Sequence, residues 1–159
     1  MKILIIGPLG AGKSSRGKGA VWTNHYPGKP NDKEKSIQRY ESNEELFLGV
    51  WKGKEQIAIG SITLSKMHHP WAMPQGGFGL AILEPYTGLG IGSRILKELE
   101  KWAIKQGVHR IVASVRHNNK RALGLYLKRG YQIEGMARET AFFDNQWQHT
   151  YYIAKIVNP

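Results

Sequence analysis

The sequence predicts an α/β fold with one central sheet of mixed direction, and two observations carry this prediction. Strand-like segments come first and are followed by the order β-α-β-α-β-β. The later segment 90–106 has the apolar spacing of an amphipathic helix, a second helix is expected over 119–129, and a glycine follows each. A chain of 159 residues is long enough for one domain that buries about two-thirds of its unfolded surface.

The first third is predicted to hold a strand, a long loop and a hairpin. Residues 1–6 are apolar and predict a short strand, whereas 7–30 carry six glycines and three prolines, a composition typical of loops. A short helix is expected within 31–43. Segments 46–51 and 57–64, joined by a Lys-Gly-Lys turn, predict a β-hairpin.

Helices and strands alternate in the second half. Ile91, Ile95, Leu99 and Trp102 recur at helical spacing, and Gly107 follows the helix they predict. The predicted elements are strand 78–83, helix 90–106, strand 109–115, helix 119–129, strand 131–136 and a closing hairpin of 141–143 with 148–157.

Charge and composition restrict the class of protein. Of the net charge of +11, residues 1–40 contribute +6 (eight Lys or Arg, two acids) and 41–159 contribute +5 (fifteen and ten). This distribution indicates a basic arm, and the remaining charge suits an anionic ligand. Because Arg and Lys are not interleaved with stacking aromatics, nucleic acid is not favoured as a partner. With no cysteine and no apolar run of roughly 20 residues, we expect a cytoplasmic protein without disulfides or a membrane span.

One glycine-rich segment near the start imitates a phosphate loop. Residues 7–14, GPLGAGKS, fit the pattern G-x-x-x-x-G-K-[ST] directly after a strand-like run. A P-loop enzyme would need a long helix next and an acidic residue to help hold Mg²⁺. Instead Gly17 and Gly19 follow, each costing about 1 kcal/mol inside a helix, and no acid occurs before Asp32. A P-loop nucleotide-binding protein therefore stays the less favoured alternative.

A second glycine-rich segment has the context that the first one lacks. In the stretch FGLAILEPYTGLGIGSRILK, residues 78–97, a predicted strand is followed by Gly88, Gly90 and Gly92 where an amphipathic helix begins. The first turn of a helix has N–H groups without partners and favours negative charge. Glycines allow a phosphate to approach these groups, so this unit predicts a pyrophosphate site, although glycine there also suits a simple tight turn.

Two linked motifs then point to a family. Residues 87–92, TGLGIG, follow the pattern Q/R-x-x-G-x-G/A except at the first position. A second pattern lies downstream. It consists of an Asn, an Ala three residues later, Leu-Tyr six and seven residues later, and Gly followed by an aromatic residue eleven and twelve residues later. The residues that fit it are Asn119, Ala122, Leu125, Tyr126, Gly130 and Tyr131. From about Leu46 to Val157 the chain resembles the GCN5-related N-acetyltransferase (GNAT) superfamily. The resemblance implies a mixed, mostly antiparallel central sheet flanked by helices, and transfer of an acetyl group from acetyl-CoA to an amine.

The sequence departs from the family pattern at three places. Thr87 stands where Gln or Arg is usual, which removes one side-chain donor near the phosphates, and Tyr131 replaces the commoner Phe. The family also begins with a strand and two helices, which residues 1–45 do not clearly supply. We therefore predict an atypical, basic, loop-rich segment over 1–45 and a GNAT domain over 46–159, within one compact unit.

The resemblance also implies roles for individual residues. Tyr126 would be the general acid that protonates the leaving thiolate, with an ordinary core tyrosine as the competing interpretation. Glu84, by its position at the end of the strand beside the cofactor, is a candidate base, although an ordinary strand-end Glu is the commoner explanation. Asn119 would bind the pantetheine arm, or cap its helix, or do both. Main-chain groups at Ile82 and Leu83 would pair with that arm. The cofactor-binding residues implied are Ile82, Leu83, Thr87, Gly88, Leu89, Gly90, Ile91, Gly92, Ser93 and Asn119, and no metal site is expected.

The acceptor and the assembly are left open by the sequence. The family acetylates amines of small molecules and of peptides or proteins, and the walls of the acceptor site fall in its least readable parts. A homodimer is one option. A non-catalytic acyl-CoA-binding or basic interaction module is the alternative to an enzyme, and the Tyr at 126 argues against it.

Overall fold

A computed structural model describes residues 2–6, 44–65 and 73–158. The phosphate-loop-like residues 7–14 and the helix expected within 31–43 lie outside the described residues. Two α-helices, one short 3₁₀ helix and seven strands are described. Their bounds are β1 Lys2–Ile6, β2 Glu45–Lys52, β3 Glu55–Ser65, β4 Gln75–Ile82, η1 Glu84–Tyr86, α2 Ile91–Lys105, β5 Arg110–Arg116, α3 Lys120–Lys128, β6 Gln132–Phe143 and β7 Gln146–Ile156.

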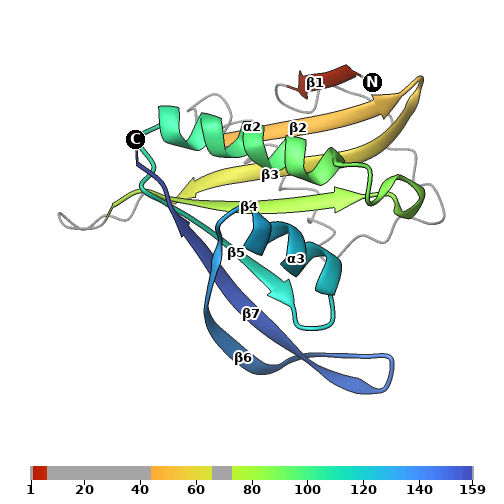
Figure 1. The fold of residues 1–159 in the computed structure, drawn as a ribbon, viewed down its shortest axis with the longest axis vertical. Coiled ribbons are helices and arrows are strands. Elements are labelled where there is room, and N and C mark those ends of the chain that lie inside the picture. The colour runs from red at the N-terminus through yellow and green to blue at the C-terminus, as the bar shows by residue number, and fades with distance from the viewer. Residues whose placement is uncertain (1, 7–43, 66–72, 159) are drawn as a thin grey trace, which may run out of the picture.

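The strands form one sheet in the order β1-β2-β3-β4-β5-β7-β6 (Figure 1). Every neighbouring pair is antiparallel except β4 and β5, which run parallel. The prediction of a mixed, mostly antiparallel sheet with flanking helices is therefore confirmed. Strand β1 pairs with β2, so the first residues of the chain belong to the same sheet as the rest.

The closing hairpin differs from its prediction. Segments 131–136 and 141–143 were expected as separate strands, but both lie in the single strand β6, which pairs with β7 along its length. The register shifts between Ala137 and Ala141, and Glu139 has a left-handed φ of 54°. This bulge interrupts the alternation of side chains, which explains why the sequence pattern suggested two strands.

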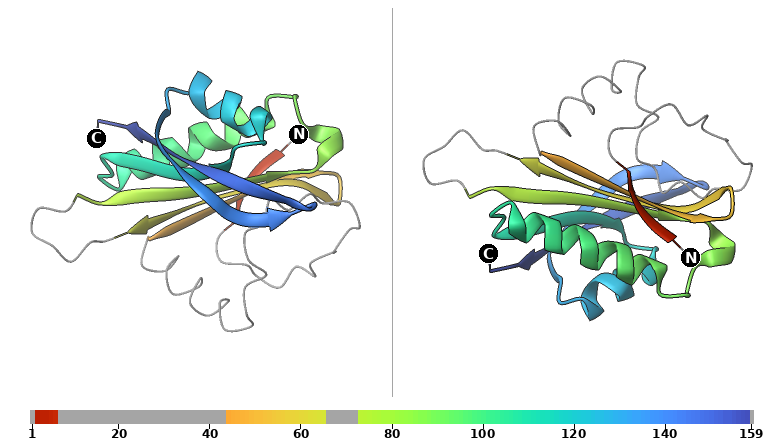
Figure 2. Two further views of the ribbon diagram at one scale, coloured as in Figure 1. Left: turned by 90° about the horizontal axis from the view of Figure 1, so that it is seen from below. Right: turned by 90° about the horizontal axis from the view of Figure 1, so that it is seen from above.

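The two helices cover one face of the sheet (Figure 2). In α2 the apolar stripe predicted from Ile91, Ile95 and Leu99 is buried, and it packs against β3 and β4. A methyl group at Gly60 of β3 would collide with Ile95 and lie 2.9 Å from Leu80 Cδ2, so glycine is needed there for the helix to approach. Neither described helix is long and apolar enough to cross a membrane.

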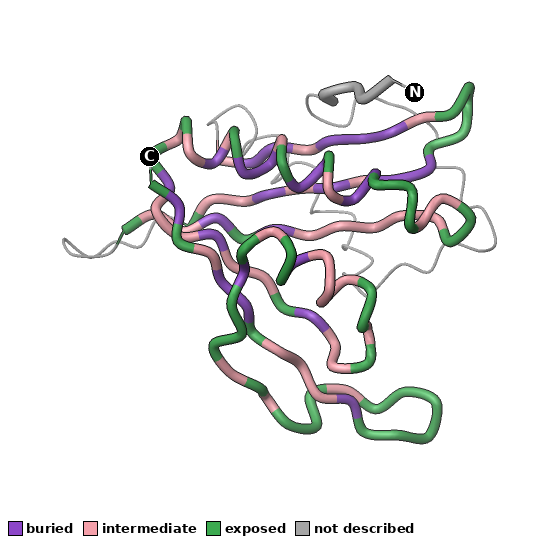
Figure 3. The backbone as a smooth tube through the Cα atoms, in the orientation of Figure 1, coloured by how far each residue is buried: buried purple, intermediate pink, exposed green. Residues whose placement is uncertain are grey.

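The two edges of β4 differ, and the difference creates the site. On one side, eight residues of β4 pair with β3, from Gln75 to Ile82. On the other side, only Gln75, Gly76 and Gly77 pair with β5. Beyond Gly77 the two parallel strands separate. Burial follows this division, because the core lies under α2, whereas the β6–β7 ribbon is largely exposed (Figure 3).

Candidate active site

A groove of about 1090 Å³ opens where β4 and β5 separate. Its walls come from β4 residues 78–82, β5 residues 114–116, the loop before α2, most of α3, and a short part of β6 and β7. The wall residues of β4 and β5 are those that have no ladder partner across the gap. Backbone groups of an unpaired strand edge can bind an extended ligand as an added strand would.

The second glycine-rich loop forms the groove's end nearest α2. Gly88 and Gly90 have left-handed φ values of 77° and 78°, where side chains are strained, and a Cβ at either would meet nothing within 4 Å. Gly90 is the N-cap of α2 and supplies no side-chain hydrogen bond. The first-turn N–H groups of Ile91, Gly92 and Ser93 therefore lack intrahelical partners. They are suited to an anion at this end of the groove.

Gly92 has a different reason for being glycine. A Cβ there would lie 3.0 Å from Leu125 Cδ2 and 3.1 Å from Ile82 Cδ1. The start of α2 is thus fitted closely between β4 and α3, so the N–H groups of the loop lie against the groove that both elements line.

Thr87, the position that departs from the family pattern, ties the loop to α3. Its hydroxyl donates to the Glu84 carbonyl oxygen at 2.8 Å and accepts from Arg121 Nη1 at 2.6 Å. Its backbone N–H also donates to the Glu84 carbonyl, at 3.1 Å. Thr87 therefore holds a cation of α3 beside the loop, which restores positive charge where the usual Gln or Arg is missing.

Helix α3 contributes a cap and a phenol to the groove. The side chain of Asn119 accepts from the Ala122 N–H at 3.1 Å, so its capping role is confirmed, and Asn119 also lines the groove. Tyr126 lines the groove although its exposed fraction is only 7%. Its ring meets the edge of Phe78 with centroids 5.2 Å apart. Burial raises the pKa of Tyr126 to about 12, so this phenol is a proton donor at neutral pH.

Comparison with known proteins agrees with this geometry. The model of the acetyltransferase (GNAT) family matches residues 16–131. The chain belongs to this family. The match begins within the predicted segment 1–45, so the boundary at residue 45 stays a prediction.

Two curated relatives of this GNAT protein carry names that include an activity. YjcK of Bacillus subtilis, named as a probable N-acetyltransferase, is 25% identical over 77% of this chain and 67% of its own length. AaaT of Escherichia coli, named as an L-amino acid N-acetyltransferase, is 24% identical over 62% of this chain and 61% of its own length. The chain thus spans about two-thirds of these relatives. Family and relatives together support an N-acetyltransferase enzyme.

Solved structures share the fold. A GNAT-family acetyltransferase from Streptococcus pneumoniae superposes with a TM-score of 0.69 at 24% identity, covering 79% of this chain and 74% of its own. The structure of yncA from Salmonella typhimurium, solved with its cofactor acetyl-CoA, gives a TM-score of 0.70 at 14% identity, covering 86% of this chain and 78% of its own.

The GNAT site does not bring all the predicted residues to the groove. Nine of the twelve line it: Ile82, Glu84, Thr87, Gly88, Gly90, Gly92, Ser93, Asn119 and Tyr126. The side chain of Ile91 is buried in the core and that of Leu89 is exposed to solvent, so the prediction for these two residues concerns their backbone N–H groups alone and stays a prediction. The N–H of Leu83 donates to the Ile57 carbonyl and its own carbonyl accepts from Tyr86 N–H, both at 2.9 Å, so its main chain is already engaged.

The GNAT groove also has walls that sequence reasoning missed. Ser114 and Arg116 of β5, Thr140 of β6 and Thr150 of β7 line it, and the two threonine hydroxyls lie 2.7 Å apart. The sequence held no signal for them, because the strand register and the bulge in β6 bring them together.

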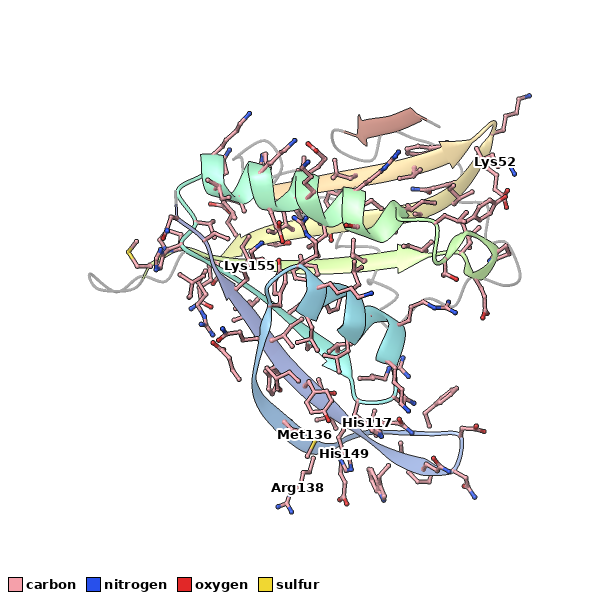
Figure 4. All side chains as sticks on the ribbon, viewed as in Figure 1. Lys52, His117, Met136, Arg138, His149 and Lys155 are labelled. Atoms are coloured by element: carbon pink, nitrogen blue, oxygen red, sulfur yellow. The ribbon has the colours of Figure 1, made fainter. Side chains whose placement is uncertain are left out.

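Two histidines fix this end of the GNAT sheet. His117 Nδ1 accepts from the His149 backbone N–H at 3.1 Å, and His149 Nδ1 accepts from the Glu139 N–H at 2.9 Å. Figure 4 shows both rings on the β6–β7 side of the molecule, and their centroids are 5.0 Å apart. These bonds hold the end of β5, strand β7 and the bulge of β6 in one arrangement, which sets the positions of Arg116 and Thr140.

Proposed function

We propose that this protein is an acetyl-CoA-dependent N-acetyltransferase that moves an acetyl group to a primary amine of a small molecule or peptide by direct attack in a ternary complex. One observation carries the proposal. The unpartnered N–H groups at the start of α2 and the buried phenol of Tyr126 lie along a single groove. In a thioester that carries phosphates, the phosphates would lie at the start of α2 and the thioester sulfur would lie near the Tyr126 hydroxyl.

The residues present fit acetyl-CoA in three respects. The start of α2 offers N–H donors to a pyrophosphate, and Lys120 and Arg121 add positive charge beside it. The unpaired edge of β4 offers main-chain groups to an extended pantetheine arm. Gly79 lines the groove, and a Cβ added there would have no neighbour within 4 Å. The backbone of Gly79 is also not left-handed, so the fold itself does not require glycine at this position. A ligand passing close to the strand would explain it.

When bound, acetyl-CoA would supply an acetyl group activated as a thioester. The amine nitrogen forms the new C–N bond, the C–S bond breaks, and the amine loses one proton while the sulfur gains one. Tyr126 donates a hydrogen bond to the developing thiolate. Because the pKa of Tyr126, about 12, exceeds the thiol value of roughly 8.5, Tyr126 stabilises the thiolate mainly as a donor. A proton reaches the sulfur from Tyr126 as solvent returns one to the phenol oxygen, and the proton that the amine loses passes to the proposed base, Glu84.

Glu84 is the proposed base. It lies in η1 directly after β4, its side chain is exposed, and it lines the groove. Its carboxylate is the only acidic group among the described groove residues. Glu84 is exposed to solvent, whereas Tyr126 is buried.

Binding and turnover test the proposal together. Acetyl-CoA should raise the melting temperature of the purified protein, ATP should not, and a mixture of primary amines should cause release of CoA from acetyl-CoA. Stabilisation by acetyl-CoA without CoA release from any amine would favour the non-catalytic acyl-CoA-binding module. Stabilisation by ATP alone would contradict the proposal.

A further inference from the structure

Part of the groove wall lies on the sheet face opposite α2 and α3. The side chains of Phe78 and Leu80 in β4 point to the face that the helices cover. Phe78 contacts Tyr126 of α3, and Leu80 lies beside the position where Gly60 faces α2. Side chains alternate along a strand. Gly76 of β4 lies on the helix-covered face and pairs with Ile111 of β5, so the Ile111 side chain lies on that face too. Because side chains alternate along β5, Ser114 and Arg116 project to the opposite face. The direct pairing of Arg116 with Thr150 places the Thr150 side chain there as well.

Among the described residues that line the groove, Arg116 is the one charged side chain on that face. The other charged groove residues are Glu84 in η1 and Lys120, Arg121 and Lys128 on α3. Within the described part of the chain, no carboxylate forms an ion pair with Arg116. Its guanidinium instead lies over the ring of Phe143, 5.9 Å from the centroid. A partly buried guanidinium without a carboxylate partner has unused hydrogen-bonding and charge capacity.

The other polar side chains of the described groove wall on this face are neutral. Ser114, Thr140 and Thr150 carry hydroxyls, and Gln148, which shares a face with Thr150, has a side-chain oxygen that is buried without a partner among the described residues. Because these neutral groups do not offset the positive charge of Arg116, the wall disfavours an acceptor that carries only positive charges, such as a polyamine. It suits an acceptor that carries one anionic group, because Arg binds carboxylates through two parallel hydrogen bonds.

We propose that the acceptor is a free amino acid, whose carboxylate is bound by Arg116 while its amine faces the thioester near Tyr126. This inference rests on the proposed function and names the substrate class for that site. A peptide amino terminus offers the amine without a carboxylate beside it, so it would leave Arg116 unpaired. Arg116 is then a specificity-determining residue rather than part of the bond-making machinery.

Matched acceptors test the inference directly. CoA release is measured with amino acids and with the corresponding primary amides, which differ only in the carboxylate. Charge-assisted hydrogen bonds contribute enough to make kcat/KM about tenfold to hundredfold higher for the amino acid. Amine basicity works against this result, because the carboxylate stabilises the unreactive ammonium form. A preference for the amino acid must therefore come from binding.

Variants assign the effect to Arg116. Arg116→Gln should remove the preference by raising KM for the amino acid about tenfold or more, leaving KM for acetyl-CoA unchanged, and Arg116→Lys should restore part of it. Arg138→Gln is the matched control, because Arg138 is an exposed arginine of β6 that does not line the groove (Figure 4). It should behave as wild type.

Three outcomes would overturn the inference. Equal or better turnover of amides or peptides contradicts the substrate class alone. A rise in KM for acetyl-CoA in Arg116→Gln assigns Arg116 to the coenzyme instead. Absence of CoA release with every acceptor contradicts both proposals, and the melting temperature with acetyl-CoA then shows whether coenzyme binding survives.

Discussion

The two edges of β4 show how one strand serves both the core and the site. On the β3 edge, eight residue pairs and a further bond from Leu83 N–H to the Ile57 carbonyl close the sheet, and α2 packs down onto Gly60. On the β5 edge, pairing stops after three residues and the groove begins. Two glycines of the sheet differ in the same way: a Cβ at Gly60 of β3 would collide with α2, whereas a Cβ at Gly79 of β4 would meet nothing within 4 Å. The β3 edge of β4 is closed by backbone pairing, and the β5 edge is unpaired along the groove.

The largest effect is expected on the open edge, at Tyr126. Tyr126→Phe removes the hydroxyl that we assign to the leaving thiolate, so kcat should fall about 100-fold, within the range of general acid catalysis. KM for acetyl-CoA should change little, as steady-state measurement of CoA release would show.

Tyr131→Phe is the matched control for Tyr126→Phe. Both phenols are buried and both rings contact Phe78, but the Tyr131 hydroxyl faces Glu100 rather than the groove. Removal of the Tyr131 hydroxyl should change the free energy of unfolding and leave kcat unchanged. Equal losses of kcat in both variants would remove the distinction between the two tyrosines.

A methyl group on the closed edge should act on stability. Gly60→Ala places a Cβ against Ile95 and Leu80, so the free energy of unfolding should fall by about 2 kcal/mol, as overpacked cores do. Urea unfolding measures this loss. Gly79→Ala is the control, because its Cβ meets nothing and should change stability by no more than about 0.5 kcal/mol. A similar loss in both variants would mean that Gly79 is packed as closely as Gly60.

A larger side chain on the open edge should act on activity instead. Gly79→Val narrows the groove, so kcat/KM should fall about tenfold, as for a substrate that no longer fits by one or two carbon atoms. The melting temperature should stay within error of wild type. Unchanged kcat/KM would show that substrates do not pass over Gly79.

A smaller effect is expected from alkaline pH. The folded state raises the pKa of Tyr126 from 10.0 to about 12 by burial, so it holds the proton more tightly than the unfolded chain does. This contribution to the free energy of unfolding is fully present below pH 10 and is lost as the pH rises toward 12. By pH 11 the loss is about 1 kcal/mol. Urea unfolding should therefore show a steeper loss of stability above pH 10 in wild type than in Tyr126→Phe. Parallel curves would contradict the assigned burial effect.

The sequence predicted the parts of the molecule that depend on local pattern. The stripe of Ile91, Ile95 and Leu99 specified α2, and Gly88 and Gly90 marked its start because the chain there needs a left-handed conformation. Asn119 signalled the start of α3 through its cap. Each of these signals acts between residues close in sequence, which is why pattern alone was sufficient.

The groove wall formed by Arg116, Thr140 and Thr150 could not be predicted for the same reason. Arg116, Thr140 and Thr150 meet only through the β5–β7–β6 register and the bulge at Glu139, which involve residues far apart in sequence. The separation of β4 from β5 also has no local signature, because residues 78–82 are as apolar as a paired strand. Thr87, read as a lost donor, instead anchors Arg121 across 34 residues.

Hydrogen exchange with and without acetyl-CoA tests the central claim most directly. If the coenzyme binds along the open edge of β4, peptides covering residues 78–82 and 89–93 should gain protection, whereas peptides of β2 should change little. Protection confined to the β2–β3 side, or none at concentrations of acetyl-CoA that raise the melting temperature, would contradict the assignment of the groove as the acetyl-CoA site.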